Sequence, residues 1–370
     1  MGDDKGDDKQ ERRWHAMRGC ERILSGRRPV SIREQVAALA ESGYDLDGRP
    51  DMYGDGPVRV LEERVATLLG KPAAAFFPTG TMAQQVALRG WAERSGNWVV
   101  AMHPLSHLQV HERQAYATVT GLRAIWPTRQ PRQPTAAEIR ELDEPFGSLL
   151  VELPLRDAGY LLPTWDELVG LVTAAGERGA RVHLDGARLW ESVPYLAHEL
   201  PQIAELADSV YVSFYKTLGG ISGAALAGPA DLITQARAWR HRYGGQLLQQ
   251  WPAALAAFAG LDRQLPKLAD YVGHAATVAD ALAALPGARV YPNPPHTHQF
   301  RFWLPHPADQ LDHAGYAMAA EERVWVCGGW EDEPGSGMAR TEITVAEAAL
   351  DWTAAEVTDA ATRLLKRLPG

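Results

Sequence analysis

Short apolar segments that alternate with helical patterns constrain the fold of this chain more than any other feature. Seven such segments, rich in apolar residues, lie at Ala73–Phe77, Trp98–Met102, Leu122–Trp126, Leu149–Leu153, Arg181–Leu184, Val210–Phe214 and Ala224–Ala227. Helical patterns lie between many of them, notably over Thr164–Glu177 and Pro229–Arg242. Strands that alternate with helices in this way predict an α/β fold, in which helices cover both faces of a mostly parallel central sheet.

The pattern changes after about residue 252 and divides the chain into regions. An alanine-rich helical stretch from Pro252 to Leu285 leads to short strand patterns, such as Gln299–Leu304, mixed with further helices. This predicts a smaller α+β domain over residues 276–370 and a large domain over residues 31–275. The first 30 residues are mostly polar and predict a disordered N-terminal arm.

Composition excludes several classes of protein. The chain has 370 residues, 46% hydrophobic and 22% charged, which is ordinary for a soluble globular protein. Its net charge of −9 argues against a nucleic-acid partner. Two distant cysteines, Cys20 and Cys327, fit neither a disulfide framework nor a zinc site, and they suit the cytoplasm. No apolar run is long enough for a membrane helix, and the charged start does not resemble a signal peptide. We therefore expect no metal and no membrane partner.

The segment SVYVSFYKTLGGISGAALAG places a single lysine, Lys216, directly after an apolar strand. Desolvation lowers the pKa of a buried lysine, and a neutral amine can form a Schiff base with a carbonyl group. Gly219, Gly220 and Gly223 would let the backbone turn tightly close to a bound molecule. The alternative interpretation is an exposed lysine in a surface turn.

The segment RVHLDGARLW places Asp185 at the end of another apolar strand, upstream of Lys216. Parallel strands bring both residues to the carboxyl edge of the sheet, where ligands of open α/β folds bind. A buried carboxylate there needs a cationic partner, and the protonated ring nitrogen of pyridoxal phosphate is one. The alternative is a structural pair between Asp185 and Arg188.

Two further segments fit the same site. In FFPTGTMAQQ, residues Thr79, Gly80 and Thr81 separate a strand from a helix, and the start of that helix offers free N–H groups to an anion. In PLSHLQVHE, His107 could stack on a flat cofactor ring. Read singly, these segments also fit an ordinary helix cap and a structural histidine.

Together these segments resemble the pyridoxal phosphate-dependent threonine aldolase family, which belongs with the β-eliminating lyases in the aspartate-aminotransferase-like fold class. The resemblance extends from about Tyr44 to Val345. It rests on DMYGDGPVRVLEERVATLLGK, AAAFFPTGTMAQQVAL, SHLQVHE, VHLDGARLWES, SVYVSFYKTLGGISGAALAG and ARAWRHRYGG. It implies a fold type I enzyme whose large domain binds the cofactor.

The resemblance also implies roles for individual residues. Lys216 matches the Schiff-base lysine, and His107 matches the histidine that stacks on the ring. Cofactor contacts are implied for Gly80, Thr81, His107, Asp185, Arg188, Ser213 and Lys216. Substrate contacts are implied for Tyr53, Arg188 and Arg340, and Tyr53 matches a tyrosine that reaches an active site across a subunit interface. The implied assembly is a homodimer or homotetramer.

This sequence departs from the family pattern around the substrate. The Ser-Asp-Thr motif common near the N-terminus is absent, and Leu248 stands near the place of an arginine. After the segment at 149–153 the family usually has a histidine, whereas this chain has Arg156, which we expect to face the substrate.

These residues predict a carbon–carbon lyase of amino-acid metabolism. It would cleave the Cα–Cβ bond of a threonine-like β-hydroxy-α-amino acid to glycine and an aldehyde. Lys216 and His107 would be the catalytic residues, with His107, or a water that it orients, accepting the hydroxyl proton. The alternative is β-elimination, transamination or a transaldol exchange on the same cofactor.

Overall fold

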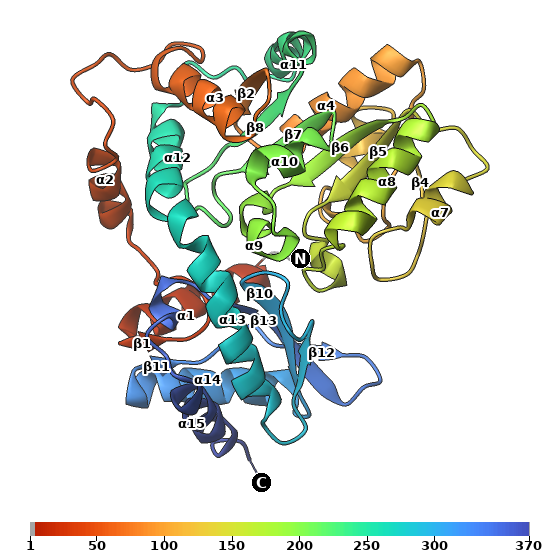
Figure 1. Ribbon diagram of the computed structural model, residues 1–370. Coiled ribbons are helices and arrows are strands. Elements are labelled where there is room, and N and C mark those ends of the chain that lie inside the picture. The colour runs from red at the N-terminus through yellow and green to blue at the C-terminus, as the bar shows by residue number, and fades with distance from the viewer. Residues whose placement is uncertain (1–3, 370) are drawn as a thin grey trace. The chain divides into compact units, whose positions relative to one another are not determined.

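Strands and helices alternate along most of residues 4–369, which are the residues that the computed structural model describes (Figure 1). These residues form two compact units. One unit is the continuous segment Val36–Pro266, and the other combines the residues up to Gln35 with those from Lys267 onward. None of the described helices has an apolar run long enough to cross a lipid bilayer.

The unit Val36–Pro266 is built on a seven-stranded sheet. Its strands, in spatial order, are β2 (Ala73–Phe77), β8 (Ala224–Gly228), β7 (Ser209–Ser213), β6 (Arg181–Gly186), β5 (Ser148–Glu152), β3 (Val99–Ala101) and β4 (Arg123–Ile125). Strand β8 runs antiparallel to β2 and β7, and the other neighbours are parallel. The seven strands predicted from the sequence and the mostly parallel sheet are therefore confirmed.

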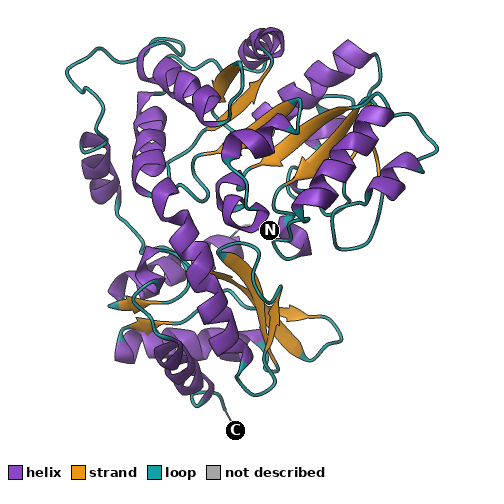
Figure 2. Ribbon diagram, in the orientation of Figure 1, coloured by secondary structure: helices purple, strands orange, loops and turns teal. Residues whose placement is uncertain are grey.

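Helices cover both faces of this sheet, because its strands are apolar on both sides (Figure 2). Helix α4 packs behind the sheet and α8 in front of it (Figure 1). The longer helices of this unit are α3 (Gly56–Leu68), α4 (Gly80–Ser95), α8 (Trp165–Glu177), α11 (Ala230–Arg242) and α12 (Trp251–Arg263). Shorter helices are α5 (His107–Val110), α6 (Ala115–Thr118), α7 (Ala136–Arg140), α9 (Val193–Leu196) and α10 (Leu200–Glu205). Helix α2 (Ile32–Ala40) lies where the two units join in sequence.

The other unit is a smaller α+β domain, as the sequence predicts. Its antiparallel sheet has the strand order β12 (Glu331–Glu333), β13 (Met338–Thr344), β10 (Gln299–Leu304) and β9 (Arg289–Tyr291). A second, two-stranded sheet pairs β1 (Arg22–Ile23) with β11 (Val324–Trp325). The long helices are α1 (Asp4–Gly19), α13 (Leu268–Ala283), α14 (Ala308–Glu322) and α15 (Ala354–Leu365).

From Asp4 onward, the N-terminal region differs from the predicted disordered arm over residues 1–30, whose first three residues lie outside the described part of the chain. Helix α1 spans Asp4–Gly19, and its last turn buries Met17 in a cluster with Cys20 and Trp325. Strand β1 then pairs with β11 in parallel. The buried apolar side chains Met17, Cys20 and Ile23 of this polar segment thus lie in one cluster. They are covered by residues some 300 positions later in the chain, and no local pattern reveals that cover.

The domain boundary also differs from the predicted one at residues 275 and 276. The alanine-rich stretch is two helices, α12 and α13, which a short 3₁₀ turn over Leu265–Lys267 separates. Pro266 lies in that turn, where it removes a backbone N–H that a continuous helix would need. The first unit ends at this proline, so all of α13 belongs to the smaller unit.

Candidate active site

The carboxyl ends of β5, β6 and β7 bring polar side chains to one edge of the large sheet. Glu152 ends β5, Asp185 is the next-to-last residue of β6, and Ser213 ends β7. In the strand register, Asp185 pairs with Glu152 on one side and with Tyr211 on the other. The predicted convergence of strand ends is thus present in the structure.

Asp185 is a buried carboxyl group with one oxygen unused. The side chain is 1% exposed, and its Oδ1 atom accepts a hydrogen bond of 3.1 Å from the N–H of Ala187. Its Oδ2 atom has no hydrogen-bond partner among the described residues, so the alternative of a structural pair with Arg188 is not realised. Burial raises the pKa of Asp185, and the charge of Lys216 opposes that rise. Such an oxygen fits a cationic group of a bound molecule.

Lys216 follows β7 in a loop that folds back on itself. The Gly220 N–H donates a hydrogen bond of 2.8 Å to the Phe214 carbonyl, and the Phe214 N–H donates one of 3.1 Å to the Gly223 carbonyl. Burial lowers the pKa of Lys216, and the positive charge of Arg188 lowers it further. This environment fits a lysine that supplies a neutral amine. The Lys216 side chain is half-buried, so it is not the exposed turn lysine of the alternative interpretation.

The predicted anion cradle lies at the start of α4. The Thr79 hydroxyl caps the helix by accepting a hydrogen bond of 3.2 Å from the Met82 N–H. A side chain at Gly80 would overlap the Tyr211 hydroxyl, so this position admits only glycine. The neighbouring Thr81 is partly exposed. N–H groups at the start of this 16-residue helix can meet a phosphate.

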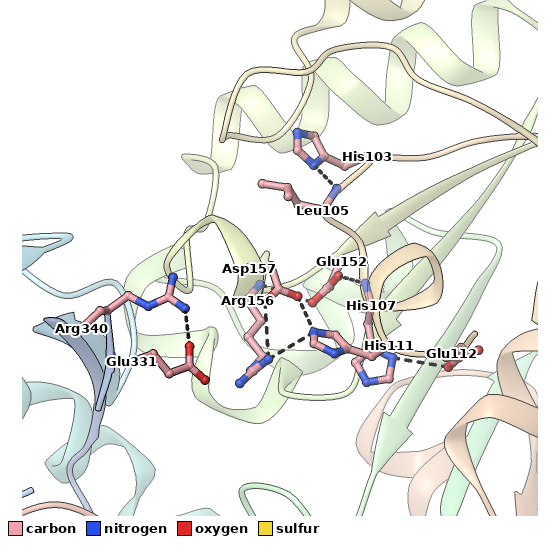
Figure 3. A network of polar contacts seen from close by, with 10 residues as sticks. All are labelled: His103, Leu105, His107, His111, Glu112, Glu152, Arg156, Asp157, Glu331 and Arg340. Carbon is pink, nitrogen blue, oxygen red and sulfur yellow. Dashed lines mark hydrogen bonds and ion pairs between the residues drawn. The ribbon is translucent and has the colours of Figure 1, made fainter. Parts of the chain in front are cut away.

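His107 opens helix α5 and is fixed by two carboxyl groups (Figure 3). Its backbone N–H donates a hydrogen bond of 2.7 Å to Glu152 Oε2. Its ring atom Nδ1 lies 3.4 Å from Oε1 of the buried Glu112. The charge of His107 also lowers the pKa of Asp185, which places the two residues within electrostatic reach of one another.

Glu152 is a site residue that the sequence analysis missed. Besides His107, it accepts a hydrogen bond of 3.3 Å from the Arg156 N–H. Burial raises its pKa to about 8, and the neighbouring Asp185 adds to this rise. The available signal was a carboxylate at the end of an apolar segment, LLVELP, which is the same signal that identified Asp185.

Ser213 and Arg188 lie beside this edge with partners of their own. The fully buried Ser213 hydroxyl donates a hydrogen bond of 2.7 Å to the Ala187 carbonyl, so it would have to break that bond to donate to a phosphate. The Arg188 guanidinium lies 5.6 Å from the centre of the Tyr160 ring. Its charge acts on both Lys216 and Tyr215.

The remaining predicted residues lie in three different places. Arg156 begins the 3₁₀ turn Arg156–Ala158 after β5, and its Nη1 atom lies 3.3 Å from the Nε2 atom of His111 (Figure 3). Tyr53 is 53% exposed, in a left-handed backbone conformation. Arg340 belongs to β13 in the smaller unit, where it pairs with Glu331 at 3.0 Å (Figure 3). Its role toward the substrate stays a prediction.

The residues present fit pyridoxal phosphate on three counts. The unpartnered Asp185 Oδ2 suits the protonated ring nitrogen, and the half-buried Lys216 suits the aldehyde carbon. The start of α4, kept open by Gly80, suits the phosphate.

Comparisons with known proteins agree with this reading. The model of the β-eliminating lyase family matches residues 46–302. The low-specificity L-threonine aldolase of Escherichia coli K12 is 31% identical over 262 residues, which are 69% of this chain and 78% of that protein. A candidate L-allo-threonine aldolase of Listeria monocytogenes is 34% identical with a TM-score of 0.88, over 97% of this chain and 99% of that one. A candidate aromatic amino acid β-eliminating lyase/threonine aldolase of Exiguobacterium sp. 255-15 is 34% identical with a TM-score of 0.89, over 96% and 100%.

The fold is that of a fold type I pyridoxal phosphate enzyme. Within this class of enzymes, the match over residues 46–302 shows that the chain belongs to the β-eliminating lyase family. It is a pyridoxal phosphate-dependent lyase.

Proposed function

We propose that this enzyme cleaves the Cα–Cβ bond of a threonine-like β-hydroxy-α-amino acid to give glycine and an aldehyde. The observation that carries the proposal is the buried Asp185, whose free oxygen lies at the same sheet edge as Lys216. Relatives named L-threonine aldolase, at about 30% identity over most of the chain, support this reaction.

The chain's own residues divide the work of holding the cofactor. When bound, pyridoxal phosphate supplies an electron sink for the bonding pair that is left at the substrate's Cα. Lys216, with its lowered pKa, would hold the cofactor as a neutral amine, and Asp185 would keep the ring nitrogen protonated. Gly80 and Thr81 bind the phosphate at the start of α4. Replacing water by these fixed groups holds the cofactor in one orientation.

Other residues act on the substrate. His107, whose backbone N–H is bonded to Glu152 and whose charge acts on Asp185, would cover the ring of a bound cofactor. Arg188 binds the α-carboxylate, because a guanidinium can grip a carboxylate with two parallel hydrogen bonds. Arg156 faces the substrate at the position where the family usually has a histidine.

A product assay tests this function. The purified protein with added pyridoxal phosphate is incubated with L-threonine, L-allo-threonine and bulkier β-hydroxy amino acids, and glycine and aldehyde are quantified. We expect equal amounts of glycine and aldehyde from at least one of them. A keto acid, or no glycine while the cofactor stays bound, would instead support β-elimination, transamination or a transaldol exchange.

We also propose a cytoplasmic homo-oligomer with active sites at its subunit interface. Exposed apolar side chains gather where the Tyr53 N–H donates a hydrogen bond of 2.9 Å to the Leu248 carbonyl. Met52, Tyr53, Leu247 and Leu248 are all exposed there. Exposed apolar side chains on these two hydrogen-bonded segments form an apolar patch that favours a protein contact, and a second copy of the chain is the partner that the family resemblance implies. Both cysteines are free and buried, which suits a reducing compartment.

A further inference from the structure

A second histidine lies beside the predicted one and has a carboxylate of its own. His111 directly follows helix α5 as its C-cap residue, one turn after His107. Its Nε2 atom lies 2.6 Å from Oδ2 of Asp157, in the 3₁₀ turn that follows β5. Arg156, from the same turn, approaches the same nitrogen at 3.3 Å. Two side chains of one turn, distant in sequence from His111, thus contact its ring (Figure 3).

The two imidazole rings are neighbours with separate partners. The ring centres of His107 and His111 are 5.1 Å apart, and the ring planes are tilted by 42°. His107 faces Glu112, whereas His111 faces Asp157 (Figure 3). The histidine that stacks on a cofactor ring and the histidine that exchanges a proton can therefore be different residues.

The bond to Asp157 fixes which nitrogen of His111 can act as a base. A carboxylate accepts a hydrogen bond, so the neutral ring carries its proton on Nε2 and donates it to Asp157. The other nitrogen, Nδ1, is then unprotonated and has no hydrogen-bond partner among the described residues. A carboxylate that orients an imidazole and stabilises its charged form is the arrangement that makes histidine an effective general base.

Exposure also separates the two histidines. The side chain of His111 is 36% exposed, against 26% for His107. The carboxylate of Glu112, which faces His107, is 2% exposed, so His107 sits on a buried and fixed support. Asp157 is 18% exposed, so His111 lies farther toward the open side of the site.

We propose that His111, oriented by Asp157, is the general base that takes the proton of the substrate's β-hydroxyl group. This inference rests on the proposed function. The proton moves from the hydroxyl oxygen to Nδ1, and the electron pair left on oxygen forms the carbonyl bond of the aldehyde. The Cα–Cβ bonding pair stays with the glycine fragment, which takes up a proton to become glycine. His111 then releases its proton, so no further reactant is consumed.

In this assignment Arg156 and Asp157 both act on the imidazole ring of His111. Asp157 is a positioning residue that acts through His111. Arg156 places a cation beside the same ring, opposite in sign to Asp157, with His107 and Glu112 as the other titratable groups around it. The turn Arg156–Ala158 has no histidine, but it contacts His111, which follows α5.

Two reactions of the same enzyme test the proposal. Cleavage of a β-hydroxy amino acid needs a base at the hydroxyl group, whereas exchange of the glycine α-proton with deuterated solvent does not. In His111→Gln we expect kcat for cleavage to fall about 100-fold or more, as is usual when a general base is lost. We expect glycine exchange and pyridoxal phosphate binding to stay at wild-type levels. Asp157→Asn should show the same split with a smaller loss, and the exposed His313→Gln is the matched control.

Each outcome decides the proposal. Selective loss of cleavage in both variants supports it. Normal cleavage by His111→Gln would overturn it and return the role to His107 or a water. An equal loss of cleavage and exchange would also overturn it, because His111 would then be structural. A wild-type enzyme that exchanges glycine protons but cleaves no β-hydroxy amino acid would overturn the proposed function, and this inference with it.

Discussion

Glu152 and Asp185 are register partners at the carboxyl ends of β5 and β6, so two carboxyl groups lie side by side at one buried sheet edge. Both are almost fully buried, and the charge of Asp185 makes ionisation of Glu152 less favourable. They differ in their bonds. Glu152 is held by the N–H groups of His107 and Arg156, whereas Asp185 keeps one oxygen free. Glu152 therefore serves the protein scaffold, and Asp185 is left for a ligand.

The raised pKa of Glu152 makes stability depend on pH. Its pKa rises from 4.5 to about 8 on folding, so between these values the folded protein keeps a proton that the unfolded chain has released. The free energy of unfolding must then fall as pH rises through this window, by up to about 1.4 kcal/mol per pH unit from this one group. Glutamine mimics the protonated form, so Glu152→Gln should remove this dependence.

Urea unfolding of the cofactor-free protein at several pH values between about 5 and 8 measures this effect. The wild type should lose stability relative to Glu152→Gln as pH rises. The exposed Glu141→Gln should follow the wild type. Parallel curves for wild type and Glu152→Gln would show that Glu152 is ionised in the folded protein throughout.

Lys216 carries the most direct prediction. Lys216→Ala should abolish turnover, because no other lysine is described at this sheet edge to bind the cofactor as an amine. Borohydride reduction followed by peptide mass spectrometry should find pyridoxyl groups on Lys216 in the wild type and on no residue of the variant. The exposed Lys366→Ala serves as control. Normal turnover by Lys216→Ala would refute the assignment.

Much of this fold was predictable because its signals are local. Each strand of the large sheet is a short apolar run, and Asp185 and Lys216 are single charges at the ends of such runs. Glu152 carried the same signal, but the apolar Leu153 after it let the strand be read one residue further. The pairing of His111 with Asp157 was not predictable, because it joins a helix end to a turn 46 positions away. Helix α1 was missed for the same reason, since its cover comes from the other end of the chain.

Gly80 provides a test of the anion cradle. In Gly80→Ala the added Cβ would overlap the Tyr211 hydroxyl, so α4 or β7 must shift. We expect weaker binding of pyridoxal phosphate by about tenfold or more and a lower melting temperature, since overpacking typically costs about 1–3 kcal/mol. Gly176→Ala in helix α8 is the matched control, because a Cβ there meets no atom. That control should gain stability, by roughly 1 kcal/mol. Unchanged cofactor binding by Gly80→Ala would remove the start of α4 from the site.

The apolar patch at Tyr53 and Leu248 predicts a subunit interface. If this patch is a subunit interface, Leu248→Glu should shift the protein toward monomers in sedimentation velocity and lower activity in parallel, because burying an unpaired carboxylate is costly. Val119→Glu, at another exposed apolar position, should change neither. Full activity of a monomeric Leu248→Glu protein would exclude an active site shared between subunits.

A variant of Ser213 tests whether its hydroxyl group stabilises the fold or contacts the phosphate. Its hydroxyl donates to the Ala187 carbonyl, and both residues are buried, so Ser213→Ala leaves that carbonyl without its partner. An orphaned buried acceptor costs about 1–3 kcal/mol, and the cofactor-free variant should lose that much stability in urea unfolding. If the hydroxyl serves only this bond, the affinity for pyridoxal phosphate should change little. A large loss of affinity without a loss of cofactor-free stability would instead mean that Ser213 turns its hydroxyl to the phosphate when the cofactor binds.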